Sequence, residues 1–133
     1  MKKILIFGSG SIGNHMTNAS IKLGYEVFIT DKNNSALTRM KKKIFINRYG
    51  YWSKKINLVK YNDVAKLKIL YDLVILGTPP ETHLDLFNFC KREIKFKKLL
   101  IEKPLSVYNQ NYYDFKFDKK KYFIFCGYNH SLS

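Results

Sequence analysis

The first 31 residues contain the pattern that most constrains the fold of this chain. Residues 4–7, Ile-Leu-Ile-Phe, form an apolar run typical of a strand buried in a parallel sheet. Residues 8–13 read Gly-Ser-Gly-Ser-Ile-Gly, apolar side chains recur at helical spacing over 11–23, and 26–30 form a second strand-like run. We predict a strand, glycine loop, helix and strand, a unit that binds phosphate groups at the amino end of its helix.

The three glycines have separate physical roles in such a loop. Gly8 permits a tight turn, Gly10 lets the backbone approach a pyrophosphate, and Gly13 lets the helix pack against the strand. The backbone N–H groups of Ser11 and Ile12 would then face the anion at the positive end of the helix dipole.

The residues around the loop favour a dinucleotide over a nucleoside triphosphate. A P-loop requires Lys and then Ser or Thr after its last glycine, whereas this chain has Asn14 and His15. Asp31 ends the second predicted strand, where a carboxylate accepts hydrogen bonds from ribose hydroxyls and repels a 2′-phosphate. We therefore predict NAD as the cofactor, with NADP possible because the adjacent Lys32 offsets this repulsion. A role for Asp31 as the cap of the next helix is compatible with this one.

The remainder of the chain continues the alternation of strands and helices. Further helices are predicted near 34–45, 63–70 and 81–95, and further strands near 58–61, 72–76, 99–101 and 121–127; 47–56 is expected to be a loop or a frayed helix end. The predicted core face of the last helix comprises Leu84, Phe87, Cys90 and Ile94. We expect one α/β domain over 1–133, a Rossmann-type doubly wound parallel sheet of about six strands, with ligands at the carboxyl ends of the strands.

Composition and charge narrow the classes of partner. The net charge is +14 among 133 residues, but the lysines are scattered along the chain rather than gathered in a stripe, which disfavours nucleic acid as the partner. No apolar segment approaches the ~20 residues of a membrane span. Cys90 and Cys126 lack metal-site spacing, so we expect no metal and a reduced, cytoplasmic protein.

Three later motifs extend the pattern. They are 77–83, Gly-Thr-Pro-Pro-Glu-Thr-His; 102–104, Glu-Lys-Pro; and 127–130, Gly-Tyr-Asn-His. A lysine such as Lys103, at the carboxyl end of a predicted strand, can donate or relay a proton if burial lowers its pKa. Together with the glycine loop and Asp31, these motifs resemble the Gfo/Idh/MocA oxidoreductases, relatives of glucose-fructose oxidoreductase and inositol dehydrogenase. The resemblance covers essentially the whole chain, which looks like the N-terminal nucleotide-binding domain of that family.

The resemblance implies roles for individual residues. Lys103 would be the catalytic lysine, which contacts the substrate and moves the proton that accompanies hydride transfer. Glu102 would lie near the nicotinamide ribose, and Pro104 would follow a cis peptide bond in the cofactor site. The nicotinamide side of the cleft would be lined by Thr78, Pro79 and His83.

The resemblance also implies a function. It predicts an oxidoreductase of the sugar or cyclitol dehydrogenase type, which transfers a hydride to or from a secondary alcohol carbon of a sugar-like small molecule. Family members continue into a substrate domain that supplies further catalytic groups, whereas this sequence ends at Ser133, so we expect the 133-residue chain alone to lack a complete active site. A non-catalytic dinucleotide-binding module, a truncated remnant and a basic nucleic-acid-binding domain remain alternatives.

An aromatic-rich segment suggests an interaction surface. Where the missing domain would pack, the sequence contains Tyr108, Tyr112, Tyr113, Phe115 and Phe117. Because exposed apolar patches usually find a partner, we expect the chain to form a homo-oligomer.

Overall fold

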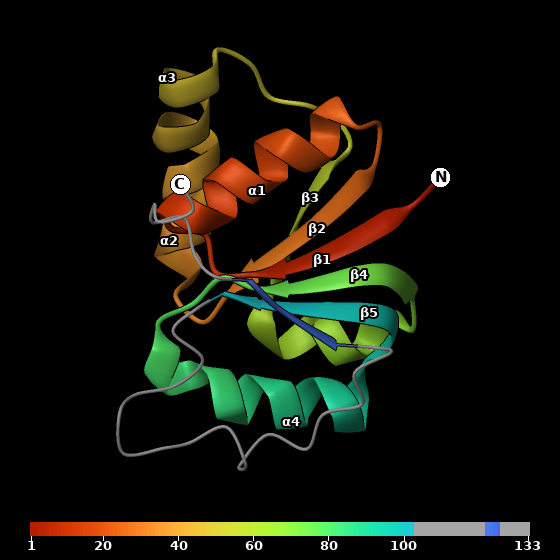
Figure 1. Cartoon of the computed structure of the whole chain (residues 1–133). Coiled ribbons are helices and arrows are strands. Elements are labelled where there is room, and N and C mark those ends of the chain that lie inside the picture. Colours follow the sequence, from red (N-terminus) through yellow and green to blue (C-terminus); the bar gives the residue numbers. More distant parts are fainter. Residues whose placement is uncertain (103–121, 126–133) are drawn as a thin grey trace.

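A parallel sheet runs through the centre of the molecule (Figure 1). The computed structural model describes residues 1–102 and 122–125; Lys103, Pro104, the aromatic-rich segment and the 127–130 motif lie outside this range. The strands are β1 (Lys3–Phe7), β2 (Glu26–Asp31), β3 (Ile56–Lys60), β4 (Leu70–Leu76), β5 (Lys95–Glu102) and β6 (Tyr122–Phe125). Their order is β3-β2-β1-β4-β5-β6, and every neighbouring pair is parallel. The predicted Rossmann-type α/β fold is confirmed.

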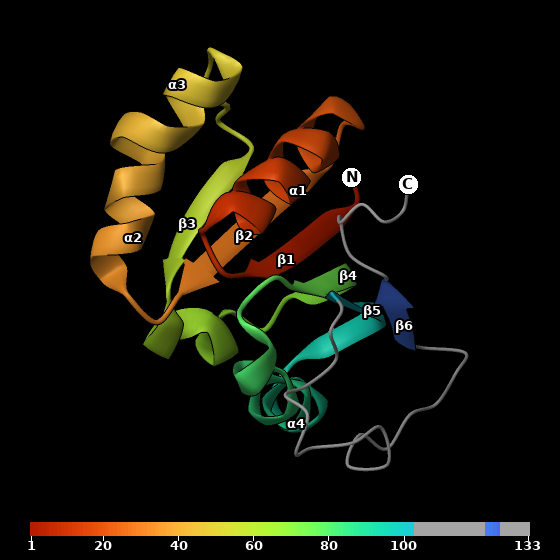
Figure 2. The same ribbon diagram turned by 60° about the vertical axis from the view of Figure 1, so that its left-hand side comes forward.

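Helices cover both faces of the sheet (Figure 2). One face carries α1 (Ser11–Lys22), α2 (Asn34–Arg39) and α3 (Phe45–Tyr49), and the other carries α4 (His83–Glu93) with a 3-10 helix over Tyr61–Leu67. Alternate side chains of β1 point to opposite faces of the sheet. Ile4 and Ile6 belong to the core between the sheet and α1 to α3, while Leu5 and Phe7 belong to the core between the sheet and α4.

The first β-α-β unit agrees closely with its prediction, but α1 buries an unexpected face. Its buried residues are Gly13, Asn14, Thr17 and Ser20. The apolar residues that recur at helical spacing, Ile12, Met16, Ala19 and Leu23, are exposed or only partly buried. The small side chains of the buried face let α1 lie close to the sheet.

The second helical segment is longer than predicted. After α2 the chain passes through a π-helical turn, Met40–Ile44, into α3, which ends at Gly50 with φ +82°. Phe45 is fully buried, and its ring contacts those of Tyr49, Tyr51 and Trp52 at centroid distances of 4.8, 5.3 and 5.5 Å. This aromatic cluster holds part of the segment 47–56, which we expected to be a loop or a frayed helix end and which begins as the last turn of α3.

Two other helices also differ from their predicted bounds. The helix predicted near 63–70 is a 3-10 helix that ends before Lys68, a residue with φ 54°, and the helix predicted to reach residue 95 stops at Glu93 because Lys95 already pairs with Leu70 in the sheet. In α4, Phe87 and Cys90 of the predicted core face are fully buried, Leu86 is buried as well, and Leu84 is only partly buried. Within the described residues, none of the helices has the length and apolar character needed to cross a bilayer.

Candidate functional site

The turn from β1 into α1 depends on Gly8. Its φ is +107°, and a Cβ at this position would lie 2.9 Å from the carbonyl oxygen of Gly77. The N–H of Gly8 donates to the carbonyl of Thr30 at 2.8 Å, and the N–H of Gly77 donates to the carbonyl of Phe7 at 2.9 Å. These bonds join the carboxyl ends of β1, β2 and β4, where the strand order changes direction and Rossmann-type folds bind ligands.

The other two loop glycines face different surroundings. A Cβ on Gly13 would lie 1.8 Å from the carbonyl oxygen of Gly8, so only glycine lets α1 approach the turn this closely. A Cβ on Gly10 would meet nothing within 4 Å. Gly13 is therefore required by internal packing, whereas Gly10 borders open space that a ligand could approach.

The side chain of Asn14 holds the loop in shape. It is fully buried, and its Nδ2 donates to the carbonyls of Ser9 at 2.9 Å and Gly10 at 2.8 Å. From the sequence, Asn14 served only to exclude a P-loop, and its role in the loop was not predicted. The missed signal was a polar residue on a helix face that packs against the sheet.

The amino end of α1 is suited to an anion. Gly10 is its N-cap and provides no side-chain cap, and the first turn contains no acidic residue. The first N–H groups of a helix, here those of Ser11 and Ile12, have no partner within the helix. Arg48 of α3 adds a positive charge, and its Nη1 donates to Ser11 Oγ at 3.3 Å. Together these features favour a phosphate group at this position.

Asp31 connects the glycine loop to the end of β2. Its Oδ2 accepts hydrogen bonds from the backbone N–H of Ser9 at 2.8 Å and from Ser9 Oγ at 2.9 Å, and its Oδ1 accepts from the N–H of Asn33 at 2.9 Å. The cap of α2 is Asn33, whose side chain accepts from the N–H of Ser35 at 3.0 Å, so the interpretation of Asp31 as that cap is wrong.

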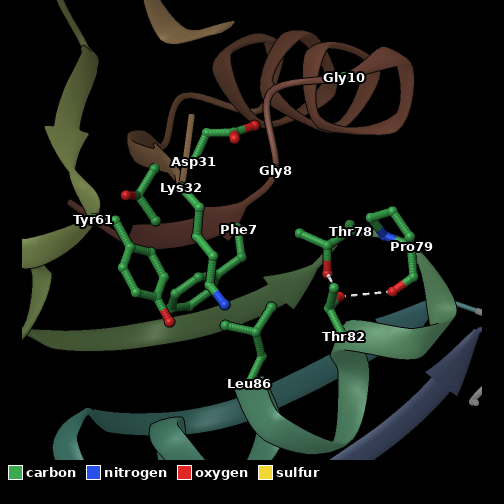
Figure 3. Close-up of a pocket in the computed structure, with 12 residues that line it drawn as sticks. Phe7, Gly8, Gly10, Asp31, Lys32, Tyr61, Thr78, Pro79, Thr82 and Leu86 are labelled. Atoms are coloured by element: carbon green, nitrogen blue, oxygen red, sulfur yellow. Dashed lines mark hydrogen bonds between the residues drawn. The ribbon is translucent and has the colours of Figure 1, made fainter. Parts of the chain in front are cut away.

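A cavity of about 300 Å³ opens at this edge of the sheet (Figure 3). It brings together six predicted cofactor residues, Gly8, Gly10, Asp31, Lys32, Thr78 and Pro79. The other lining residues are Phe7, Thr30, Tyr61, Gly77, Thr82 and Leu86. Tyr61 and Leu86 were not predicted as site residues, although Tyr61 directly follows the carboxyl end of β3, where ligand contacts are common in such sheets.

An aromatic and aliphatic wall gives the cavity its chemical character. The Tyr61 ring meets the Phe7 ring edge-on at a centroid distance of 6.3 Å, and Lys32 Nζ lies 5.4 Å from the Tyr61 centroid. Burial raises the pKa of the Tyr61 hydroxyl. Such a wall suits a flat, uncharged ring such as a nucleobase.

The turn after β4 forms the opposite wall. Thr82 Oγ1 donates to the carbonyl of Pro79 at 2.6 Å and also hydrogen-bonds to Thr78 Oγ1, as Figure 3 shows. His83 is 1% exposed, and its Nε2 lies 2.8 Å from the carbonyl oxygen of Thr78. The cavity lining includes Thr78 and Pro79 but not His83, because that side chain packs beneath the turn.

Glu102 is the last residue of β5, where it pairs with Phe125 of β6. It therefore lies at the same carboxyl edge of the sheet as the glycine loop. Across residues 1–102 and 122–125, His, Cys, Asp and Glu side chains form no group of three or more that could hold a metal ion.

Comparisons with known proteins agree with this geometry. No family model matches the chain. The glycerol-3-phosphate dehydrogenase [NAD(P)+] of Staphylococcus aureus is 23% identical over 110 residues, which are 82% of this chain and 33% of that enzyme. The chain thus spans about a third of the length of this relative.

Solved structures share the fold over a similar fraction of their length. A myo-inositol dehydrogenase from Corynebacterium glutamicum is 26% identical, with a TM-score of 0.54, over 80% of this chain and 29% of that one. GenD2 from gentamicin A biosynthesis, in complex with NAD, is 16% identical with a TM-score of 0.59, over 80% and 28%. KijD10, a 3-ketoreductase from Actinomadura kijaniata crystallised with NADP, is 20% identical with a TM-score of 0.55, over 79% and 30%. These neighbours are oxidoreductases of the Gfo/Idh/MocA type, which the sequence motifs resemble.

Proposed function

We propose that this chain is the dinucleotide-binding domain of a nicotinamide-dependent oxidoreductase of the Gfo/Idh/MocA type. The observation that carries the proposal is that the open Gly10 backbone, the uncapped amino end of α1 and the Asp31 carboxylate border one cavity at the point where strand order changes direction. Each of these features matches one part of a dinucleotide.

The residues present fit the cofactor along its length. The adenine ring would lie against Phe7, Tyr61 and Leu86, and the pyrophosphate would lie over Gly10 at the amino end of α1. The adenosine ribose would hydrogen-bond to Asp31.

Asp31 has acceptor capacity left for the ribose. A carboxylate offers about four lone-pair sites, and three are used by the N–H groups of Ser9 and Asn33 and the hydroxyl of Ser9. Rotation of Ser9 Oγ would free a second site, and the backbone N–H of Ser9 would still keep the loop attached to Asp31. Two ribose hydroxyls can therefore be accommodated.

The remaining half of the cofactor would extend towards the ends of β4 and β5. Thr78 and Pro79 would line its path, and Glu102 would lie near the nicotinamide ribose. The bound nicotinamide supplies the hydride acceptor or donor, and Lys103 is proposed to hold and move the proton of the substrate hydroxyl. The substrate is proposed to be a sugar or cyclitol, held by a substrate domain outside these 133 residues.

We further propose that the chain is cytoplasmic and that it self-associates through its aromatic-rich segment. Light scattering at high protein concentration would detect this self-association.

Calorimetric titration tests the cofactor site directly. The chain is expected to bind NADH or NADPH, with ATP and magnesium as the control, because a site without the P-loop lysine should not prefer a triphosphate. Binding of neither dinucleotide, or tighter binding of ATP, would refute the proposed function.

A further inference from the structure

A second cavity adjoins the one proposed for adenosine. It measures about 560 Å³ and lies beyond the carboxyl ends of β2 and β3. Three lysines line it, Lys32, Lys60 and Lys66, together with Asp63. Lys32 and Tyr61 border both cavities, so the two spaces meet at these side chains. Figure 3 shows both side chains on one side of the first cavity.

The charge in this second cavity is only partly neutralised. Lys66 Nζ lies 3.5 Å from Asp63 Oδ1, which pairs one lysine with the one acidic residue of the lining. Lys32 Nζ lies over the Tyr61 ring, and the Lys60 side chain makes no ion pair or hydrogen bond to any residue in the described part of the chain. Two lysine charges therefore remain to attract an anion.

The position of Lys60 relates this charge to the cofactor. In the parallel register of β2 and β3, Lys60 is the partner of Asp31, the residue proposed to bind the adenosine ribose. Because Lys32 lines both cavities, the second cavity is the space next to a ribose held by Asp31, and a group on the 2′ oxygen of that ribose could enter it. Repulsion from the Asp31 carboxylate is opposed by attraction to the ammonium groups of Lys32 and Lys60. The second cavity itself is lined by three lysines and one acidic residue, so its lining carries a net positive charge that attracts a phosphate.

We propose that the cavity lined by Lys32, Lys60 and Lys66 binds the 2′-phosphate of NADP(H), so that the domain accepts NADPH at least as tightly as NADH. This inference rests on the proposed dinucleotide site, and it differs from the preference for NAD that Asp31 alone predicts. Two lysines would determine the selectivity for NADPH. Lys60 lies at the end of β3, and Lys32 directly follows β2.

Paired titrations of the full chain with NADH and NADPH at one fixed ionic strength test the inference. Lys60→Gln is expected to weaken NADPH binding by roughly three- to tenfold and to leave NADH binding unchanged. Lys54→Gln is the matched control, because it removes the same charge from an exposed lysine in the turn before β3, outside the cavity. Thermal unfolding of both variants confirms that they fold.

Competition by inorganic phosphate tests whether the cavity binds the 2′-phosphate specifically or attracts any anion. In the wild type, phosphate should weaken the binding of NADPH more than that of NADH, and Lys60→Gln should reduce this difference. If NADH binds and the ratio of the two affinities is the same in Lys60→Gln as in wild type, or changes equally in Lys54→Gln, the lysine cavity is not a phosphate site. If neither dinucleotide binds, both the inference and the proposed function are overturned.

Discussion

Asp31 has a structural role in the loops around the cavity as well as its proposed role in binding the ribose. Its carboxylate accepts from Ser9 in the glycine loop and from Asn33 before α2, so it fixes the two loops that flank the cavity. The sequence predicted the ribose contact from the position of this residue at a strand end. It did not reveal the bonds to Ser9, because a local pattern carries no information on which loop lies across from a strand end.

Asn14 provides a test of loop stability at the level of a single residue. Asn14→Leu removes the donor to the carbonyls of Ser9 and Gly10 and should lower the free energy of unfolding by about 1–3 kcal/mol. Urea denaturation measures this change. His15→Ala is the neighbouring control and should cost less than ~0.5 kcal/mol, because His15 is exposed. Equal, small effects of the two substitutions would show that the Asn14 bonds do not hold the loop.

The candidate site was predictable only in part. Strand ends and turn glycines identified Gly8, Gly10, Asp31 and Lys32, and the family resemblance implied Thr78 and Pro79. All six residues line the cavity. His83 belongs to the same motif as Thr78 but points into the packed layer beneath the turn, as the 2.8 Å contact with the Thr78 carbonyl shows. Sequence spacing could not decide between these two orientations.

At the scale of elements, the contact between β1 and α1 is the most demanding feature of the fold. Gly13→Ala would place a methyl group on the Gly8 carbonyl, where 1.8 Å separates the two positions, so α1 must move away from the sheet. Overpacking of this kind typically lowers the free energy of unfolding by about 1–3 kcal/mol. Because the clash is with a backbone carbonyl that cannot rotate away, we expect a loss of about 3 kcal/mol or more for this variant. Chemical denaturation with circular dichroism detection checks it, and wild-type stability would contradict the packing described for α1.

The helices and strands that could be predicted are those marked by a pattern within their own stretch of sequence. A buried apolar run, a glycine loop and a helix-ending glycine suffice to define β1, α1 and β2. The segment around α3 was not predictable in this way, because the Phe45 cluster with Tyr49, Tyr51 and Trp52 forms only in the folded chain. Likewise, α4 ends at Glu93 because the pairing of β4 with β5 begins two residues later.

At the scale of the whole molecule, two ion pairs link neighbouring strands near their amino ends, away from the cavities. At the amino ends of the strands, Lys3 pairs with Glu26 at 3.1 Å and Lys97 pairs with Asp72 at 3.3 Å. The pKa of Asp72 is lowered mainly by the hydrogen bond from the Lys3 backbone N–H, and to a smaller extent by the neighbouring Lys97 side chain. At the carboxyl ends, Lys60 has no such partner in the described part of the chain. Lys60 thus leaves one positive charge without an acidic partner at the end of the sheet that is proposed to meet an anionic cofactor.

Alkaline pH tests the packing of the core under α4. Tyr71 is 1% exposed, and burial raises its pKa from 10.0 to about 12. The folded state therefore keeps a proton that the unfolded chain releases between pH 10 and 12, so global stability should fall as pH rises through that window. Tyr71→Phe should reduce the fall, as urea denaturation at pH 8 and pH 11 would show.

The same variant has a second expected property at neutral pH. The Tyr71 hydroxyl has no hydrogen-bond partner among the described residues, so its removal should leave stability at pH 8 unchanged or slightly higher. A large loss at pH 8, or an alkaline fall as steep as that of wild type, would contradict the burial of an unpaired hydroxyl.

The most direct test of the central claim is the titration of NADH into Gly10→Ala beside wild type. A methyl group at Gly10 meets nothing within 4 Å, and the backbone there has φ −82°, so the variant should unfold like wild type. In the proposed complex the same methyl group occupies the approach of the pyrophosphate, so affinity should fall by roughly tenfold or more. Normal stability with weakened NADH binding is the predicted result. Equal NADH affinity in the two proteins would contradict the claim that this loop holds a dinucleotide.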